Sequence, residues 1–171
     1  MYWLLFIFAA IILLSVVFAN MSLAPWVPTR SRDLKRIFQL SQLKPDEIFY
    51  DLGCGNGKTV IYASKNYKAK AIGLEIALPL FFVCKLRQIF HKDKNLIFKF
   101  KNLFSEDLSP ADVIYFFAMP DKISGRLKDK LANEAKSGVR IISYVFPIKN
   151  WVPAVVDKPS EKDLPIYLYK I

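Results

Sequence analysis

The chain contains very little histidine and cysteine. Among its 171 residues there is one histidine, His91, and there are two cysteines, Cys54 and Cys84. The spacing of the cysteines matches neither a disulfide framework nor a zinc site, so no metal site is predicted. The histidine lies in a polar His-Lys-Asp-Lys turn and is expected to be a solvated loop residue. Histidine-based metal sites and Ser-His-Asp triads are therefore poorly supported.

Acidic residues are also scarce relative to basic ones. The sequence has 25 Lys and Arg against 15 Asp and Glu, which gives a formal net charge of +10. Such an excess favours an anionic partner, which could be lipid headgroups, nucleic acid or both. No internal repeat or low-complexity segment interrupts the chain, and its length predicts one globular domain.

Charge is missing altogether from the N-terminal segment, where no charged residue precedes Arg30. The stretch from Tyr2 to Ala19 is apolar apart from Ser15, and as a helix it would be about 27 Å long, close to the thickness of the bilayer's hydrocarbon core. The basic residues that follow it favour a cytoplasmic location for the rest of the chain. The predicted organisation is a transmembrane anchor at 1–24, a proline-containing connector at 25–30 and a globular domain at 31–171.

A cleaved secretory signal peptide that ends at Ala19 is the alternative to this anchor. A signal peptide usually has a positively charged N-terminal region and a shorter apolar core. Because neither feature is present, the sequence favours a retained anchor.

Beyond the connector, apolar strand-like segments alternate with helical patterns. Ser31 is expected to cap a helix that runs to about Leu40, with Leu34, Ile37 and Phe38 on its apolar face. Strands are predicted at 48–52, 69–75, 96–100, 111–117, 139–146 and 164–171, and helices at 58–65, 76–90 and 124–136. This order predicts an α/β fold, a Rossmann-like, doubly wound, mostly parallel sheet.

Glycine is infrequent but concentrated at one place. Three of the six glycines, Gly53, Gly55 and Gly57, follow the first predicted strand within five positions. A Gly-x-Gly-x-Gly turn allows positive φ and lets the backbone approach a ligand closely at the start of a helix. The spacing is one residue too short for a Walker phosphate-binding loop, although Gly57-Lys58-Thr59 is present. The third glycine also comes one position too early for a dinucleotide-binding fingerprint.

The turn, from Asp51 to Gly57, resembles the first motif of class I S-adenosylmethionine-dependent methyltransferases. In that family an acid ends the first strand, an acid after the second strand binds the ribose hydroxyls, and Asp or Asn after the third contacts the adenine amino group. Glu75 and Asn102 match the second and third of these positions. The resemblance implies an S-adenosylmethionine site made of Thr29, Asp51, Gly53, Cys54, Gly55, Asn56, Gly57, Glu75, Asn102 and Leu103.

Individual roles also follow from this resemblance. Thr29 is expected to close over the cofactor. Asp51 is expected to hold the glycine turn in place and to attract the α-ammonium group of the cofactor. Taken singly, each polar residue has an ordinary alternative as a helix cap or a solvated strand end.

Segments outside the cofactor motif resemble the small membrane-anchored protein-lysine methyltransferases, whose mitochondrial members modify the ATP synthase c subunit and the adenine nucleotide translocase. The matching segments are the apolar N-terminus, 25–29, 117–120, and 138–147 followed by Trp151. This resemblance implies methyl transfer to a lysine of a protein in or at the membrane, with membrane lipid as a second partner. In a eukaryote it implies the mitochondrial inner membrane. The chain after Trp151 is short, so a reduced final hairpin is expected.

Aromatic residues near the ends of the fourth and fifth strands are candidates for the acceptor site. A channel of Phe116, Phe117, Met119, Pro120, Tyr144 and Trp151 would desolvate a lysine amine and tolerate its cation. The candidate catalytic residues are Met119, Pro120, Asp121 and Trp151, with Asp121 orienting the ammonium group. Core packing is the alternative for these side chains and is favoured for Phe116, and helix capping is the alternative for Asp121.

Other functions also remain open from the sequence. An RNA methyltransferase would suit the basic charge. The Asn/Asp-Pro-Pro-Tyr motif that holds a planar base amine is, however, replaced by Phe117-Ala-Met-Pro120. A lipid or small-molecule methyltransferase, or a non-catalytic protein that binds the cofactor, would fit the same cofactor motif.

Overall fold

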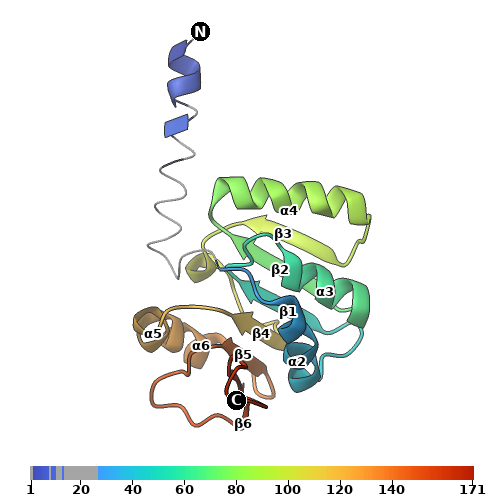
Figure 1. Cartoon of the computed structure of the whole chain (residues 1–171), viewed down its shortest axis with the longest axis vertical. Coiled ribbons are helices and arrows are strands. Elements are labelled where there is room, and N and C mark those ends of the chain that lie inside the picture. Colours follow the sequence, from blue (N-terminus) through green and yellow to red (C-terminus); the bar gives the residue numbers. More distant parts are fainter. Residues whose placement is uncertain (1, 8, 11–12, 14–26) are drawn as a thin grey trace.

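The computed structural model describes residues 2–7, 9–10, 13 and 27–171 (Figure 1). Within these residues, none of the helices has both the length and the apolar character needed to cross a membrane. The predicted anchor at 1–24 lies largely outside the described residues, so it stays a prediction.

From residue 27 onward the chain alternates helices and strands. The helical elements are α2 (Ser31–Ser41), α3 (Lys58–Tyr67), α4 (Leu78–His91), η1 (Leu103–Ser105), α5 (Pro120–Lys122), η2 (Ile123–Leu127) and α6 (Lys128–Glu134). The strands are β1 (Ile48–Leu52), β2 (Lys70–Glu75), β3 (Leu96–Phe100), β4 (Val113–Phe116), β5 (Arg140–Tyr144), β6 (Val155–Asp157) and β7 (Ile166–Lys170).

The strands form one sheet of seven in the order β3-β2-β1-β4-β5-β7-β6. The pairs within β3-β2-β1-β4-β5 are all parallel, whereas β7 runs antiparallel to both β5 and β6. The predicted Rossmann-like, mostly parallel sheet is therefore confirmed.

Helices cover both faces of this sheet (Figure 1). On one face α2, α3 and α4 pack over a core that includes Phe38, Phe49 and Phe98. On the other face η2 and α6 pack over a core that includes Leu52 and Phe116. Successive residues of a strand point to opposite faces, so both cores draw on the same apolar strands. Phe116 is fully buried, as the packing alternative predicted.

The predicted apolar face of α2 is confirmed, because Leu34, Ile37 and Phe38 are all buried. The predicted cap is wrong. Arg30 occupies the N-cap position without a side-chain hydrogen bond, and Ser31 is the first helical residue. The Ser31 hydroxyl instead accepts a hydrogen bond from Lys58 Nζ at 2.7 Å. A tertiary contact has taken the oxygen that a local cap would use.

The C-terminal part differs most from the prediction. The helix expected at 124–136 begins at Pro120 and is interrupted at Gly125, whose φ of −112° and ψ of −125° are not helical. No residue range was predicted for strand β6, which forms with β7 the short final hairpin that was expected. Strand β6 is only three residues long and exposed, so it has little of the apolar pattern that identifies a strand. His91 is exposed as predicted but ends α4 instead of lying in a loop.

Candidate active site

Parallel strands end at a common edge of the sheet, and the candidate residues follow these ends. Strand β1 lies between β2 and β4, so the order of the strands reverses at this point. In open α/β sheets, ligands bind at the carboxyl edge beside such a reversal. The glycine turn after β1 occupies this place.

The turn is built from glycines in a left-handed conformation. The φ angles of Gly53, Gly55 and Gly57 are 92°, 56° and 75°, which L-residues with a side chain rarely adopt. The N–H groups of Gly53 and Cys54 donate to Leu74 O at 3.0 and 2.9 Å, and Gly57 N donates to Cys54 O. These donors are satisfied within the protein. The turn therefore lets a ligand approach the backbone closely, but these three N–H groups are already used within the protein.

Two glycines are required by internal packing. A Cβ atom on Gly57 would lie 2.5 Å from the Phe98 ring and 3.1 Å from Cys84 Sγ. A Cβ on Gly73, in the middle of β2, would lie 2.7 Å from Cys54 Sγ. The turn thus lies tightly against β2, β3 and α4.

Glu75, at the end of β2, joins the turn to the start of α4. Its Oε2 accepts from Gly55 N at 2.8 Å, and its Oε1 accepts from Ile76 N at 2.8 Å and Ala77 N at 2.7 Å. Burial raises the pKa of this carboxyl, and the three backbone donors oppose that rise. Each carboxylate oxygen has more than one acceptor position, so a hydroxyl can still bind there.

Asp51 lies buried on β1 beside Glu75. Burial raises the pKa of its carboxyl well above the ordinary value, and the charge of Glu75 raises it further, while a hydrogen bond from Thr59 opposes the rise. Thr59 belongs to the first turn of α3. Asp51 was expected to hold the glycine turn in place, but the direct hydrogen bond to the turn comes from Glu75. Asp51 instead contacts Thr59 at the start of α3, the helix that follows the turn.

Thr29 lies over the same edge. Its Oγ1 and the Tyr115 hydroxyl are 2.7 Å apart, and its carbonyl accepts from Lys58 Nζ at 2.9 Å. Tyr115 on β4 is the register partner of Asp51 on β1. The connector is thereby held next to the glycine turn, and the closing of Thr29 over the cofactor stays a prediction.

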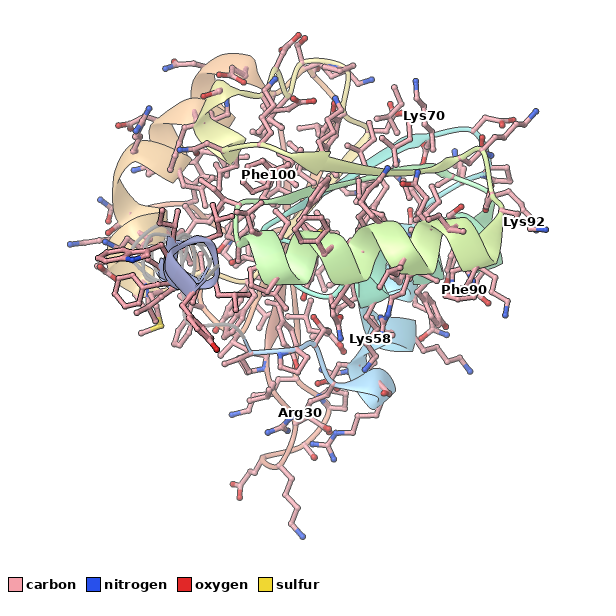
Figure 2. All side chains as sticks on the ribbon, turned by 90° about the horizontal axis from the view of Figure 1, so that it is seen from above. Arg30, Lys58, Lys70, Phe90, Lys92 and Phe100 are labelled. Atoms are coloured by element: carbon pink, nitrogen blue, oxygen red, sulfur yellow. The ribbon has the colours of Figure 1, made fainter. Side chains whose placement is uncertain are left out.

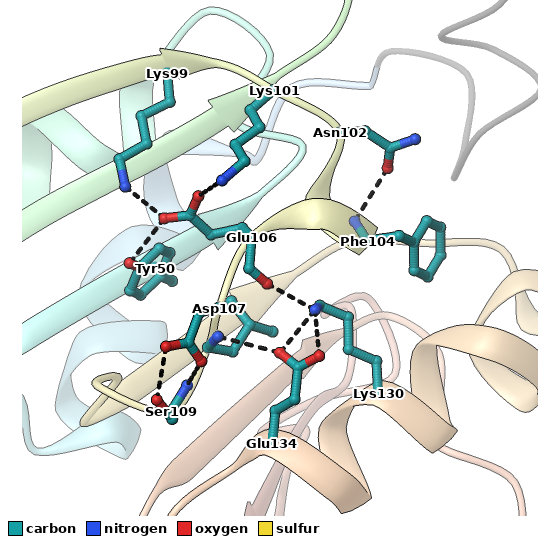
Figure 3. A network of polar contacts seen from close by, with 11 residues as sticks. Tyr50, Lys99, Lys101, Asn102, Phe104, Glu106, Asp107, Ser109, Lys130 and Glu134 are labelled. Carbon is teal, nitrogen blue, oxygen red and sulfur yellow. Dashed lines mark hydrogen bonds and ion pairs between the residues drawn. The ribbon is translucent and has the colours of Figure 1, made fainter.

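The loop after β3 carries the two remaining cofactor candidates. Asn102 caps η1, because its Oδ1 accepts from Phe104 N at 3.0 Å, and Leu103 is buried (Figure 3). The capping alternative is thus observed for Asn102. The same bond orients the amide at the carboxyl edge of β3, two strands from the turn.

A polar network around Glu106 fixes this loop in place (Figure 3). The Glu106 carboxylate accepts from Lys99, from Lys101 at 2.7 Å and from the Tyr50 hydroxyl at 3.0 Å. Lys130 on α6 donates to the Glu106 carbonyl at 2.6 Å. Burial acts to raise the pKa of Glu106, but these donors hold it below its ordinary value.

The residues predicted for catalysis follow β4 and β5, which are adjacent. Met119 is the N-cap of α5, so Asp121 is not the cap, and Met119 is 39% exposed. Pro120 and Asp121 are exposed, and Asp121 lies 3.7 Å from Lys122 Nζ. Trp151 lies beyond β5, half-buried, with its ring 5.9 Å from Tyr169 in an edge-on arrangement.

An aromatic cluster of Phe117, Tyr144 and Phe146 stands at the ends of β4 and β5. The Phe117 ring stacks on Phe146 at 6.1 Å and meets Tyr144 edge-on at 5.7 Å. The Tyr144 hydroxyl donates to the buried carboxylate of Asp33 at 2.7 Å. Two of the residues predicted to desolvate an amine, Phe117 and Tyr144, thus lie together.

Several residues of this edge were not identified from the sequence. They are Asp33, Lys58 in its role as a support for the connector, Gly73, Tyr115 and Phe146. Only Gly73 gave a local signal, since a glycine inside a strand often marks a close approach of another group. The others meet their partners only after the strands are ordered.

The edge fits S-adenosylmethionine in chemical terms. A left-handed glycine turn permits close approach to a ligand, the Glu75 carboxylate suits ribose hydroxyls, and the Asn102 amide suits an adenine edge. The aromatic cluster stands at the ends of β4 and β5, on the opposite side of β1 from Glu75 and Asn102.

Comparison with known proteins agrees with this arrangement. Residues 51–155 match the model of the ANTKMT methyltransferase domain family. A protein-lysine N-methyltransferase of Saccharolobus islandicus is 34% identical over 157 residues, which cover 86% of this chain and 93% of the relative. The adenine nucleotide translocase lysine N-methyltransferase of Mus musculus is 26% identical over 77% of this chain, but the match spans only 57% of that longer protein.

A solved structure indicates the same methyl donor. The RNA methyltransferase of Salinibacter ruber in complex with S-adenosyl-L-homocysteine has a TM-score of 0.79 and 27% identity, and the match covers 85% of this chain and 94% of that one. S-adenosyl-L-homocysteine is what remains of S-adenosylmethionine after methyl transfer. The chain therefore belongs to the ANTKMT methyltransferase domain family and is an S-adenosylmethionine-dependent methyltransferase.

Proposed function

We propose that this enzyme methylates a lysine of a protein in or at a membrane, and that an N-terminal anchor at 1–24 holds it there with the domain on the cytoplasmic side. In a eukaryotic cell the corresponding place is the mitochondrial inner membrane. The match to the S. islandicus protein-lysine N-methyltransferase, over nearly the full length of both chains, carries the choice of acceptor. The apolar stretch from Tyr2 to Ala19 supports the location.

The cofactor supplies an activated methyl group, so the protein has mainly to bind, orient and exclude water. Glu75 and Asn102 would hold the ribose and the adenine, and the turn from Gly53 to Gly57 would lie against the cofactor. Thr29, Asp51 and Leu103 complete the proposed site, with Cys54 and Asn56 contributing backbone from within the turn.

An acceptor lysine must reach the site uncharged, although its ordinary pKa is about 10.4. The aromatic cluster of Phe117, Tyr144 and Phe146 offers apolar surroundings that lower the pKa of an amine and ring faces that tolerate its cation. Met119, Pro120, Asp121 and Trp151 would line the entrance. In this arrangement the lowered pKa lets the amine lose its proton to water, and no dedicated base is required.

Labelled S-adenosylmethionine provides the test. The full chain is incubated with the cofactor, membranes and RNA from the same host, and the label is followed into protein, lipid and RNA fractions. Label on lysine of a membrane-fraction protein is the expected result. Label that enters RNA alone would instead support the second candidate, an RNA methyltransferase, which the S. ruber structure and the net charge of +10 favour.

A further inference from the structure

Helix α4 carries apolar side chains on the face that points away from the sheet. Phe82, Leu86, Ile89 and Phe90 are between 58% and 81% exposed. Leu86, Ile89 and Phe90 follow Phe82 by four, seven and eight residues, a spacing that puts all four on one side of the helix. The buried Cys84 lies on the opposite side. A helix on the surface of a soluble domain normally has a polar outer face. The apolar outer face of α4 is therefore a candidate interaction surface.

The patch continues onto the edge strand. The Phe100 ring on β3 is 49% exposed and lies 5.4 Å from Phe81, which itself lies 6.4 Å from Phe82. Figure 2 looks onto α4 from outside and shows Phe90 and Phe100 toward opposite ends of the helix. The apolar surface thus extends along the whole of α4.

The charges around this surface are mostly basic. Helix α4 contains Lys85 and Arg87 and no acidic residue. Lys92 and Lys94 are exposed just beyond its C-terminal end, and Figure 2 shows Lys92 at that end. The acid between them, Asp93, is occupied by Ser64 and by the backbone of Asn95. Apolar residues with a basic border match a bilayer that carries anionic headgroups.

We propose that the outer face of α4 rests on an anionic lipid bilayer, with its aromatic and aliphatic side chains inserted at the headgroup boundary. The proposal rests on the membrane location proposed above but concerns a different part of the chain from the anchor. A lipid surface suits a convex helix face, because it makes no demand for a complementary groove.

The contact would also orient the active site. Glu75 accepts from Ile76 and Ala77, directly before α4, so the first turn of the helix is attached to the proposed ribose-binding carboxylate. A domain that lies on α4 therefore holds this end of the carboxyl edge close to the bilayer surface. Lysines that emerge just above the membrane are the acceptors that such an orientation selects.

A fluorescent probe on the full chain tests the contact. Leu86→Cys places a label in the centre of the face, and Ala132→Cys places it at an exposed position of α6, across the sheet. Cys54 and Cys84 are buried and would remain unlabelled. In vesicles with anionic lipid, we expect acrylamide to quench the Leu86→Cys probe about threefold less than the Ala132→Cys probe, and spin-labelled lipid to quench it more.

Charge reversal supplies the second measurement. Lys85→Glu with Lys92→Glu should remove much of the protection in anionic vesicles, because it removes the attraction to the headgroups. Lys149→Glu with Lys158→Glu changes the net charge equally on exposed residues elsewhere and should leave the protection intact.

Flotation of the same vesicles distinguishes a wrong membrane location from a wrong assignment of the α4 face. A chain that does not float overturns the membrane location and this proposal together. A chain that floats while both probes remain equally accessible overturns this proposal alone. Protection of Leu86→Cys that appears already without any lipid or detergent, or only after RNA or a protein is added, would assign the face to a second copy, to another segment of the chain or to that partner, and would equally overturn it.

Discussion

The Glu75 carboxylate accepts a hydrogen bond from the Gly55 N–H at 2.8 Å, across 20 positions of sequence. Together with the bonds from Gly53 and Cys54 to the Leu74 carbonyl, this contact fastens the glycine turn after β1 to the end of β2. The same carboxylate receives the first N–H groups before α4. The residue proposed to bind the ribose therefore also determines the shape of the turn beside it.

Replacement of Glu75 should consequently weaken cofactor binding in two ways, because it removes the ribose partner and loosens the glycine turn. We expect Glu75→Ala to abolish S-adenosylmethionine binding measured by calorimetry, since hydrogen bonds to a charged group are worth about 1.5–3 kcal/mol each. Glu75→Gln keeps one acceptor oxygen and should weaken binding by roughly 10–100-fold. Glu47→Ala, a partly exposed acid before β1, is the control. Unchanged affinity in Glu75→Ala would refute the assignment.

Gly57 tests the packing of the turn. Gly57→Ala brings a Cβ to within 2.5 Å of the Phe98 ring at a φ of 75°. Overpacking and the left-handed backbone should together lower the free energy of unfolding by about 2–4 kcal/mol. Gly138→Ala has a similar φ of 84° but meets no atom within 4 Å, so it should cost only about 1 kcal/mol. Equal losses in urea denaturation would show that the Phe98 contact is unimportant.

Asp51 should make stability depend on pH. Its pKa in the folded chain is raised, so the folded state keeps a proton that the unfolded state loses at about pH 3.9. The contribution of Asp51 to stability therefore falls as the pH rises from about 4 toward the folded pKa. The free energy of unfolding of Asp51→Asn minus that of the wild type should therefore increase as the pH rises through this range. A constant difference between pH 4 and 8 would contradict the raised pKa.

Val145 has an unusual backbone conformation directly after β5. Its φ of 74° is strained for a β-branched residue, and it lies between Tyr144 and Phe146 of the aromatic cluster. Val145→Gly should raise the free energy of unfolding by about 1 kcal/mol in urea denaturation. Asn150→Gly, at a φ of 63°, should change it by only a few tenths of a kcal/mol, because asparagine tolerates this region. A loss of stability in Val145→Gly would mean that the valine side chain contributes more than the strain costs.

Much of the fold was predictable because its signals are local. The predicted ranges of β1 and β3 agree with the structure at both ends, and that of α3 agrees at its start. Each combines a regular apolar pattern with a clear boundary. Strand β6 and the break at Gly125 lack such patterns, so both were missed.

The site residues likewise divide into those with a local sequence signal and those without one. The sequence by itself determined the glycine turn, the acid at Glu75 and the position of Asn102, because each lies at or just after the end of a recognisable strand. Those features were enough to indicate the methyl donor.

Only the tertiary structure decided what these residues contact. It directs Glu75 to Gly55, Lys58 to Thr29, Tyr144 to Asp33, and the ring of Phe98 against Gly57. These pairs depend on strand order and register, which place residues distant in the sequence next to each other. Local patterns of residues indicated the class of sheet but not these pairs, and the exposed apolar face of α4 likewise became visible only once its other face was buried.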